Sequence, residues 1–350
     1  KIMTMLGALE HISDSDLDTK VKASESALAP IDSDSSQIWL SVGEKITVRS
    51  ALYAIMLASA NDAANVIAEY VGGSMDNFVK MMNDKAKELG CVNTHFVNPH
   101  GLHNKKHYTC AHDMALIAQA AFQIPLFRKI TKTVEYKIPK TKYMKEDRWL
   151  VNHQKMLYED GEFTYKNCEG GKTGFTAEAG YCYVGSLRRD ERTFIVALLA
   201  CGWPDNKGYK WKDTRRLMEY GLEHYHYREV YSNTAPDKLL VVDAFDPEIP
   251  YQTSEKISLR VKNSEESKKI LLREEEEIRM EIKTVKCKKA PVKKGEKAGT
   301  VSYYLADEKI AENVVVTERA VEKRTLEKCM KIVTAKFLTL ESLVWYVKYV

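Results

Sequence analysis

The sequence predicts an α+β fold: a domain that combines helices with an antiparallel sheet, then a small all-β domain and a C-terminal amphipathic helix. Apolar residues recur every three or four positions in several segments of residues 1–123, separated by the polar, turn-rich stretch 13–45 and a loop, which indicates helices packed on a core. From Gly180 the apolar period changes to two, which indicates strands. Near Asn233, turn residues and three prolines mark a boundary. The expected domains are residues 1–230, 234–318 and 319–350.

The composition excludes several classes of protein. At 350 residues the chain is long enough for two domains, and its net charge of +4 is too small to indicate a nucleic-acid partner. No apolar run reaches the length of about 18 residues that a membrane-spanning helix needs. The seven cysteines are scattered without a Cys-x-x-Cys pair, which argues against a disulfide framework and a cysteine-based zinc site. No metal or other cofactor is expected.

Four helices are expected in the N-terminal part of the chain. The first covers residues 1–12. The second covers residues 48–73, is broken near Ser59-Ala60-Asn61, and ends at Gly72-Gly73. The other two cover residues 74–90 and about 112–123.

Two strands and a helix follow the change of period. The segments GYCYVGSL and TFIVALLACG are typical of apolar strands, and RRDER between them predicts a hairpin. The segment DTRRLMEYGLEHY then predicts an amphipathic helix. Its expected inward face consists of Leu217, Tyr220 and Leu222.

The region after Asn233 predicts a small β domain. Four segments in it alternate apolar with polar residues, as strands do when one face of their sheet meets water. These segments are KISLRVK, IRMEIKTV, GTVSYYLA and NVVVTE.

The last 30 residues predict a helix with one apolar stripe and lysines beside it. The stripe suits packing against this or another protein. It also suits a membrane surface, because a helix with a basic face and an aromatic-rich apolar face favours the boundary between lipid headgroups and acyl chains. The membrane surface is the expected partner of this helix. Lys336, Glu341 and Lys348 argue against a spanning helix. The stripe residues are Leu326, Met330, Val333, Phe337, Leu340, Val344 and Val347.

Lys172, Thr173 and Gly174 follow two glycines and precede a predicted strand. An ordinary Gly-rich turn explains this pattern. A substrate-binding strand edge also explains it, because the ammonium and hydroxyl can face a groove while the glycine leaves room for an extended peptide. The N–H of Phe175 can then point at a developing oxyanion. The tripeptide alone does not decide between these readings.

Two other segments can complete a catalytic site. Ser59 and Asn61 lie in the helix break, where they can share one cleft or form a helix N-cap. A serine three positions before a lysine lies one helical turn away on the same face, and a partly desolvated lysine near another cation can act as a base. No serine in the chain precedes a lysine by three positions, so only Lys1 can complete such a pair, with a serine upstream of the printed sequence.

Together these segments resemble the serine D-alanyl-D-alanine carboxypeptidases, the low-molecular-mass penicillin-binding proteins of the peptidase S11 family. The resemblance covers nearly the whole chain. It implies a β-lactamase/transpeptidase-like fold for the first domain. One departure is Ala60, where the family usually has glycine in the middle of its Ser-x-Asn motif. The segments that carry the resemblance are KIMTMLGALE, IMLASANDAA, NTHFVNPHGLHNKKHYT, NHQKML and GGKTGFTAEAGYC.

The resemblance implies three catalytic residues. Lys1 would be the general base that activates the upstream serine. Ser59 would relay a proton to or from the leaving amine. Asn61 would hold the substrate amide and orient Lys1. Without the serine the polypeptide as printed is expected to be inactive, which we interpret as a truncated chain.

The resemblance also implies the substrate-binding residues. Lys172 supplies positive charge near Ser59, and with Thr173 it would attract the terminal carboxylate of the substrate; Gly174 would leave room for the peptide. The backbone N–H of Phe175 would form half of the oxyanion hole. Three further cations are weaker candidates for the carboxylate, and Lys210 is favoured among Arg188, Arg189 and Lys210.

The implied reaction is acyl transfer on a peptidoglycan stem peptide. The serine would attack the penultimate D-Ala carbonyl, the terminal D-Ala would leave, and water would release the acyl-enzyme. β-Lactam antibiotics would acylate the same serine. The implied location is the bacterial cell envelope, at the outer face of the cytoplasmic membrane.

Other interpretations remain open. A β-lactamase-like hydrolase would share the motifs, but no clear Glu-x-x-x-Asn lies between Asn61 and Lys172 to activate a deacylating water. A non-catalytic peptidoglycan-binding scaffold would lack the serine in its gene. The pair His100-x-x-His103 suggests a metal ligand set, but no acidic or cysteine ligand is interleaved, which favours a polar surface loop.

Overall fold

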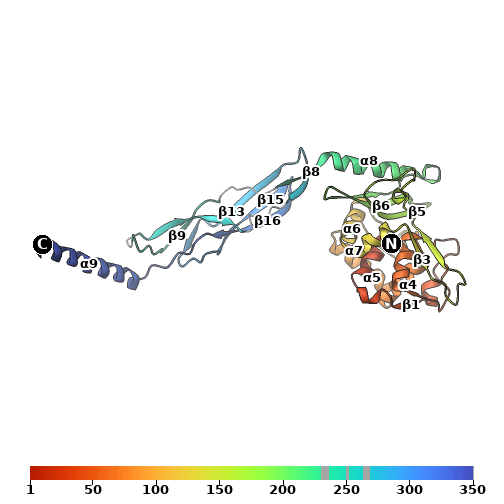
Figure 1. The fold of residues 1–350 in the computed structure, drawn as a ribbon, viewed down its shortest axis with the longest axis horizontal. Helices are drawn as coiled ribbons and strands as arrows, with labels where there is room; N and C mark the ends of the chain where they lie inside the picture. The colour runs from red at the N-terminus through yellow and green to blue at the C-terminus, as the bar shows by residue number, and fades with distance from the viewer. Residues whose placement is uncertain (230–235, 250–251, 263–268, 350) are drawn as a thin grey trace. The chain divides into compact units, whose positions relative to one another are not determined.

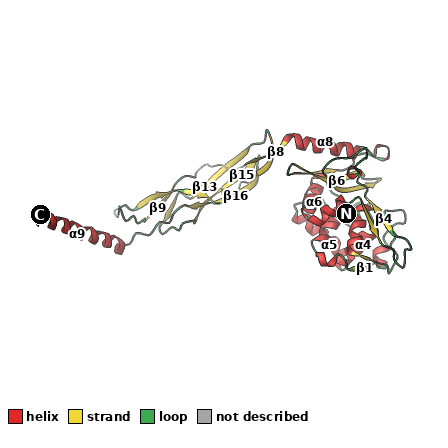
Figure 2. Ribbon diagram, in the orientation of Figure 1, coloured by secondary structure: helices red, strands yellow, loops and turns green. Residues whose placement is uncertain are grey.

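A computed structural model gives the fold of the chain and describes residues 1–229, 236–249, 252–262 and 269–349. The chain divides into two compact units, Lys1–Glu223 and His224–Val350. The first unit combines helices with antiparallel strands, and the second consists of strands and one long helix (Figures 1 and 2). The predicted fold class is therefore confirmed.

The first unit is built around an antiparallel sheet of order β5-β6-β7, in which β5 is an edge strand. Helix α8 covers one face of this sheet and the other helices of the unit lie beyond the opposite face (Figure 1). The strands are β5 (Cys168–Thr176), β6 (Gly180–Arg189) and β7 (Arg192–Leu198). The principal helices are α1 (Ile2–Leu9), α3 (Val48–Leu57), α4 (Asn61–Gly72), α5 (Met75–Glu88), α6 (Ala111–Gln123), α7 (Pro125–Lys132) and α8 (Tyr209–His224).

Alternate side chains of the sheet enter two separate cores, as the two-residue period of strands requires. Val184 and Ile195 pack into the large core of the helical side. Tyr183 and Val196 pack on the other side, against Trp211 of α8. The hairpin between β6 and β7 follows the predicted boundaries closely.

Helix α8 turns only part of its predicted face inward: Leu222 packs against the core on this side of the sheet, whereas the other two residues do not. Leu217 and Tyr220 are 48% and 45% exposed. The buried side consists of Lys210, Trp211, Thr214, Met218 and Gly221. This face was missed because its small and polar members do not stand out as apolar. At Gly221 an added Cβ would lie 2.9 Å from the Phe194 ring, so the glycine permits the helix to approach the sheet closely.

The predicted break between two helices is confirmed. Helix α3 starts after Thr47, whose side chain accepts a hydrogen bond from Ser50 N, and ends at Leu57. Helix α4 starts at Asn61 and ends before Gly73, which has a left-handed φ of 72°. The three residues between the helices are therefore free to adopt their own backbone geometry.

Smaller elements flank the helical core. Strand β3 (Glu135–Ile138) pairs antiparallel with β4 (Arg148–Val151), and this hairpin was not predicted. Helix α7 was not predicted either. The remaining elements are β1 (Lys20–Lys22), β2 (Lys45–Thr47), α2 (Glu25–Leu28) and short 3-10 turns at Asp14–Asp16, Lys155–Leu157 and Pro204–Asn206.

The second unit is a β structure with its own apolar core, which includes Leu239, Val301 and Val315. Its sheets have the orders β11-β16-β15-β13, β10-β9-β14 and β12-β8. The strands are β8 (Tyr225–Glu229), β9 (Leu239–Val242), β10 (Ser254–Ile257), β11 (Leu259–Val261), β12 (Lys269–Arg273), β13 (Ile278–Thr284), β14 (Cys287–Lys289), β15 (Lys297–Leu305) and β16 (Glu308–Thr317).

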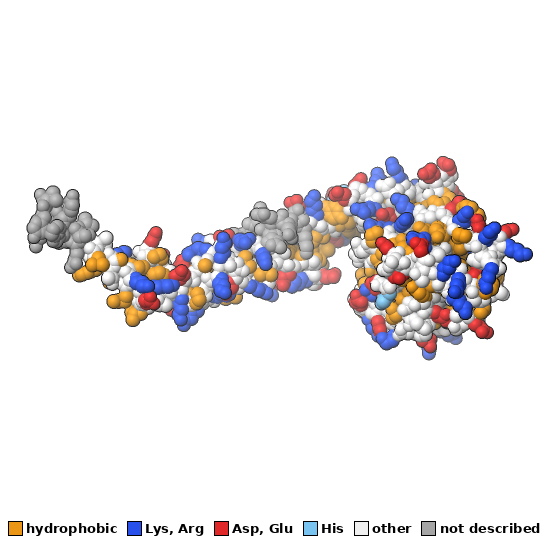
Figure 3. All heavy atoms as spheres, turned by 60° about the horizontal axis from the view of Figure 1, so that its bottom comes forward, with side chains coloured by type: hydrophobic (Ala, Val, Ile, Leu, Met, Phe, Trp, Pro, Cys, Tyr) orange, Lys and Arg blue, Asp and Glu red, His pale blue; other side chains and the backbone are white. Residues whose placement is uncertain are grey.

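Helix α9 (Leu326–Tyr349) follows the β structure. The side chains described on its apolar stripe are exposed: Leu326 by 81%, Met330 by 55%, Val333 by 57% and Phe337 by 62%. Across the residues that the structure describes, no helix combines the length and apolarity needed to traverse a bilayer. On the face drawn in Figure 3, cationic and anionic side chains are interspersed over both units, in keeping with the small net charge.

Gly170 and Gly171, just before Lys172, lie where the backbone of β5 closely approaches those of α7 and β6. Gly170 has φ 86°, and an added Cβ would lie 2.2 Å from the carbonyl oxygen of Thr131 in α7. At Gly171 an added Cβ would lie 2.2 Å from the carbonyl oxygen of Val184 in β6. The pairing of β5 with β6 is irregular between Cys168 and Gly171. The two glycines therefore let β5 enter the sheet while touching α7.

We predict that Gly170→Ala lowers the free energy of unfolding by about 2 kcal/mol or more, because it adds both backbone strain and a clash. Urea unfolding followed by circular dichroism measures the change. Gly73→Ala is the matched control: Gly73 also has a positive φ, of 72°, but an added Cβ there meets nothing within 4 Å. Equal losses in the two variants would show that crowding by α7 contributes nothing.

Candidate active site

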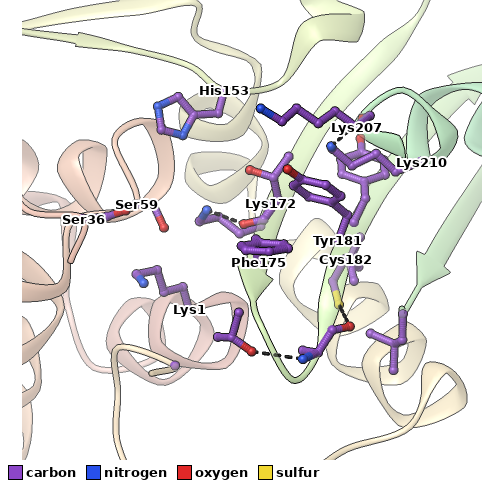
Figure 4. A pocket seen from close by; sticks show the side chains of 18 of the residues that line it. Lys1, Ser36, Ser59, His153, Lys172, Phe175, Tyr181, Cys182, Lys207 and Lys210 are labelled. Carbon is purple, nitrogen blue, oxygen red and sulfur yellow. Dashed lines mark hydrogen bonds between the residues drawn. The ribbon is translucent and has the colours of Figure 1, made fainter. Parts of the chain in front are cut away.

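A cleft of about 1180 Å³ lies between the helical part of the first unit and the edge of its sheet. Lys1 enters it from the start of α1, and Ser59 and Asn61 from the junction of α3 and α4. Lys172 enters from β5 on the opposite side (Figure 4). Three segments that are far apart in the sequence thus meet in one cleft. All seven site residues expected from the sequence line it, including Thr173, Gly174 and Phe175.

The backbone at Ser59 is in the left-handed region, with φ 57°. This geometry is unfavourable for a residue with a side chain and persists only where the surroundings enforce it. Here it ends α3 and redirects the chain into α4. As a result the Ser59 hydroxyl points into the cleft, toward the side chains of Lys1 and Lys172 (Figure 4).

Asp62, directly after Asn61, stabilises the backbone around this junction. Its side chain is fully buried and accepts hydrogen bonds from the backbone N–H groups of Ile38 and Leu40. Burial raises the pKa of Asp62, while these amide donors oppose the shift. The N–H of Asn61 donates to the carbonyl oxygen of Ser36 over 2.8 Å, so the 36–40 loop and the start of α4 are bonded together at several points.

Lys1 is held by two oxygen acceptors. Its Nζ donates to Oδ1 of Asn61 over 2.6 Å and to the carbonyl oxygen of His100 over 2.5 Å. Burial lowers the pKa of the Lys1 side chain well below its usual value, and the nearby charge of Lys172 lowers it further; Asp62 acts in the opposite direction. An ammonium in these surroundings gives up its proton more readily than one in water.

Lys172 faces the same space from the sheet. It is 9% exposed, and its Nζ donates to the carbonyl oxygen of Thr173 over 2.7 Å. Burial lowers its pKa from 10.5 to about 8. Beyond it, the Phe175 ring is 46% exposed and packs on Tyr181 with ring centres 4.6 Å apart. Because β5 is an edge strand, one row of its backbone groups faces the cleft instead of another strand.

Two histidines that the sequence did not assign to this site also line the cleft; one of them, His100, was expected in a polar surface loop but is only 8% exposed. His153 follows β4, faces the same cleft as Lys172 (Figure 4), and has its pKa lowered by burial and by the charge of Lys172. The carbonyl oxygen of His100 is an acceptor for Lys1. His153 lies within the NHQKML segment, but nothing in that segment indicates by itself that the imidazole faces a lysine.

Lys210 lines the cleft, whereas Arg188 lines a separate smaller pocket. The Lys210 Nζ lies 4.2 Å from the centre of the Tyr181 ring and 4.9 Å from that of Trp211. Burial lowers its pKa, as does the charge of Lys155. The sequence preference for Lys210 over the arginines is therefore consistent with its position in the cleft.

The histidines near the site do not form a recognisable metal centre. Within the described residues, no group of three or more His, Cys, Asp and Glu side chains is arranged to hold a metal ion. Burial lowers the pKa of His100 and that of His107 to about 4. Both imidazoles are thus neutral at pH 7 and accept hydrogen bonds from backbone N–H groups, of Leu102 and Val97 respectively.

This arrangement suits proton transfer at a reacting hydroxyl. Two buried amines with lowered pKa values flank the Ser59 hydroxyl and the Asn61 amide. A lysine with a lowered pKa can take a proton from a nucleophile and return it to a leaving group. The cationic form of the second lysine can attract an anionic group of the substrate at the same time.

Models of two known protein families match successive parts of the chain. Residues 1–201 match the family model of D-alanyl-D-alanine carboxypeptidases, and residues 232–323 match that of the C-terminal domain of penicillin-binding protein 5. The chain is 32% identical over 330 residues to D-alanyl-D-alanine carboxypeptidase DacF of Bacillus subtilis, an alignment that covers 92% of this chain and 78% of that protein.

Solved structures are similar as well. Penicillin-binding protein 5 from Haemophilus influenzae superposes with a TM-score of 0.66 at 23% identity, covering 92% of this chain and 90% of that one, which shows a common fold. The DD-transpeptidase of Streptomyces K15 superposes with a TM-score of 0.57 at 30% identity, covering 63% of this chain and 86% of that one.

The buried charge of Lys172 predicts a gain in stability when it is removed. Below about pH 8 the lysine is protonated in both the folded and the unfolded chain, so the folded chain carries the full cost of removing the ammonium from water. Between about pH 8 and 10.5 the unfolded chain binds more protons than the folded chain. The free energy of unfolding therefore rises with pH in this range. We therefore expect Lys172→Met to raise the free energy of unfolding at pH 7 by roughly 1–3 kcal/mol.

Urea titrations at pH 7 and pH 10 measure this effect, and the gain should shrink at the higher pH. Lys80→Met is the control, because the Lys80 side chain is 73% exposed and pairs with Asp84 at the surface. Its effect should stay within about 0.5 kcal/mol. A loss of stability in Lys172→Met at pH 7 would contradict the assignment of a desolvated ammonium.

Proposed function

The chain belongs to the D-alanyl-D-alanine carboxypeptidase family, and from this premise we propose that the cleft between α1, α4 and β5 removes the terminal D-Ala of peptidoglycan stem peptides by acyl transfer. One observation carries the proposal: the amines of Lys1 and Lys172 flank the Ser59 hydroxyl in a buried cleft, and both have lowered pKa values. This is the environment that an acyl-transfer base requires.

The nucleophile in this proposal is the serine of the family's Ser-x-x-Lys motif, three positions before Lys1. One helical turn separates the two residues, so both side chains lie on the same face. The serine Oγ–H gives its proton to neutral Lys1 Nζ while Oγ bonds to the penultimate D-Ala carbonyl carbon. Asn61 and the His100 carbonyl support this step, because their oxygens hold the Lys1 nitrogen in place.

Ser59 serves the leaving group. When the bond between the carbonyl carbon and the terminal D-Ala nitrogen breaks, that nitrogen takes a proton from Lys1 through the Ser59 hydroxyl. Water then follows the reverse route: it loses a proton to Lys1 through the Ser59 hydroxyl and its oxygen bonds to the ester carbon. The bond between that carbon and the serine Oγ breaks, Oγ takes the proton from Lys1, and the shortened peptide leaves as its carboxylic acid. The left-handed backbone of Ser59 supports this role, since it directs the hydroxyl into the cleft.

The substrate lies extended along β5 in this proposal. The edge of β5 offers backbone groups for pairing with the peptide, and Gly174 has almost no neighbour at the Cβ position. The terminal carboxylate lies near Lys172 and Thr173, with Lys210 as a further cation in the cleft. The N–H of Phe175 and that of the nucleophilic serine form the oxyanion hole. A β-lactam amide would occupy the same place and acylate the same serine.

We propose further that the enzyme works in the cell envelope with α9 lying on the outer face of the cytoplasmic membrane. Support comes from the apolar stripe of α9, whose described side chains are more than half exposed. Lys336 adds positive charge outside the stripe, where Lys328 and Lys331 also lie, paired with Glu322 and Glu327. Such a helix gains free energy from burying apolar area and from attraction to anionic headgroups.

We expect the full-length protein to release D-Ala from a pentapeptide ending in D-Ala-D-Ala, and Ser59→Ala to lower kcat by about 100- to 10,000-fold, the usual worth of a proton relay. The β-carbon is retained, so the strained backbone is left as it is. Released D-Ala is measured by a coupled oxidase assay, and fluorescent penicillin reports acylation separately. Ser15→Ala, at the exposed turn Asp14–Asp16, is the control.

Two outcomes decide against this mechanism. If the gene encodes a residue other than serine three positions before Lys1, the assigned nucleophile is wrong and a non-catalytic peptidoglycan-binding role is favoured. If Ser59→Ala keeps the wild-type kcat, the proton relay does not pass through this hydroxyl.

For α9 we expect Phe337→Glu to reduce co-sedimentation with phosphatidylglycerol-rich vesicles at least tenfold, because it places a charge within the apolar stripe. Ala335→Glu is the matched control, since it adds the same charge to an exposed position on the opposite side of the helix. Equal binding by the two variants and the wild type would show that the stripe does not contact lipid.

A further inference from the structure

A second, smaller pocket of about 330 Å³ lies in the first unit, on the side of the sheet opposite α8. Helices α6 and α7 form one wall, and strands β5, β6 and β7 form the other. Among the residues that the structure describes, none lines both this pocket and the catalytic cleft. Its volume is within the range of pockets that hold small molecules, roughly 300–1,000 Å³. The proposed acyl transfer makes no use of it.

The register of the sheet places the side chains of the strand wall on one face. Arg188 of β6 pairs with Thr193 of β7, and Ser186 pairs with Ile195. Side chains two residues apart on a strand point to the same face, and directly paired residues share it. Ile195 packs against the large core on the helical side of the sheet. The Arg188 side chain therefore also lies on the helical side, where α6 and α7 pack.

The helical wall combines amides, an apolar ring and a second cation. Gln119 and Gln123 are one turn apart on α6, so their side chains lie on the same face of that helix. Phe122 packs edge-on against Phe127 of α7, with ring centres 5.1 Å apart, and gives the pocket an apolar surface. Arg128 of α7 is half-buried and lines the same pocket.

The three charged groups of the pocket do not neutralise one another. Within the described part of the chain, neither the Arg128 nor the Arg188 side chain forms a hydrogen bond or an ion pair. The half-buried Glu169 carboxylate accepts the Ser186 hydroxyl over 3.5 Å, at the outer limit of a hydrogen bond. An arginine close to a carboxylate normally donates paired hydrogen bonds to it. Opposite charges that stand apart around a hollow suit a ligand that bridges them.

The two walls of the pocket are joined at Thr131 in α7. Its hydroxyl lies 3.1 Å from the carbonyl oxygen of Arg128 and 2.9 Å from that of Glu169. The segments that carry one cation and the anion are thus held together by one side chain. Glu169 directly precedes Gly170, where β5 passes close to α7. The pocket is therefore part of the same rigid junction of α7 with β5, and its shape exists before any ligand binds.

We propose that this pocket binds a free α-amino acid with an apolar side chain. The ligand carboxylate accepts N–H groups of Arg128 and Arg188, its ammonium donates to Glu169, and its side chain lies against Phe122. A simple anion would leave Glu169 facing a like charge, so the pocket favours a zwitterion. Two sources can supply this chemistry, the D-Ala released in the cleft and amino acids from elsewhere. The site does not depend on the proposed function.

Isothermal titration calorimetry on the full-length protein tests the site with D-alanine, L-leucine and D-lactate, which carries a hydroxyl in place of the ammonium. We expect Arg188→Gln to weaken the binding of the amino acids at least about tenfold, because a charge-assisted pair of hydrogen bonds is lost. Arg189→Gln is the matched control. Arg189 is the next residue on β6, so it points to the other face of the sheet, and it lies 3.8 Å from Asp190. This variant should bind like the wild type.

Glu169→Gln separates a zwitterion from a simple anion. It should weaken D-alanine binding about tenfold and leave D-lactate binding unchanged or tighter, since only the amino acid has an ammonium to lose its partner. Equal affinities of the wild type for D-alanine and D-lactate would overturn the assignment of a zwitterion.

Lys172→Met shows whether the amino acid binds in the catalytic cleft instead. Binding that is lost in Lys172→Met and kept in Arg188→Gln would overturn the proposal, as would the absence of binding by either amino acid at millimolar concentrations. Loss in Arg188→Gln with retention in Lys172→Met supports it. Tighter binding of D-alanine then identifies the reaction product as the ligand, and tighter binding of L-leucine an amino acid from elsewhere. Calorimetry needs no turnover, so the result stands whether or not the protein releases D-Ala.

Discussion

The hydrogen bond from Lys1 Nζ to Asn61 Oδ1 connects the start of α1 to the start of α4, and the cleft depends on it. An ammonium with so little water around it is stable only when polar atoms replace the water, and Asn61 and the His100 carbonyl supply them. Neither acceptor is an anion, so the charge is solvated without being neutralised. This keeps the lysine in a state from which a proton can leave.

The other parts of the site hold the two sides of this cleft in position. On one side, Ser59 and Trp39 both adopt left-handed backbone conformations, and Asp62 lies between the segments that carry them. On the other side, Gly170 and Gly171 let β5 pass close to α7 and β6. This close packing fixes the position from which Lys172 enters the cleft. The free energy for these unfavourable features comes from the large apolar core beneath them, where α1, α3 and α4 pack together.

The sequence was informative where a local signal existed. The break at Ser59, the hairpin after Gly180 and the helices on either side of Gly73 follow from turn residues and from changes of apolar period. The inward face of α8 was predicted correctly at Leu222 and wrongly at Leu217 and Tyr220. Thr214 and Gly221 were missed because they carry no apolar signal and are buried only by their contact with the sheet. The resemblance identified the residues of the cleft, but composition and motif spacing alone could not have predicted that Lys1 lies near Lys172. The contributions of His100, His153 and Asp62 depend on chain segments that meet only in the folded protein.

The edge position of β5 has a consequence for how the protein behaves in a crowded environment. An unpaired strand edge is a template on which any extended chain can add, including a strand of another molecule. In this protein the helical wall formed by α1 and α4 stands opposite that edge, across a cleft of about 1180 Å³. A strand of another molecule can therefore reach this edge only by entering the cleft. The wall that carries the catalytic residues thus also protects the protein from joining edge to edge into aggregates.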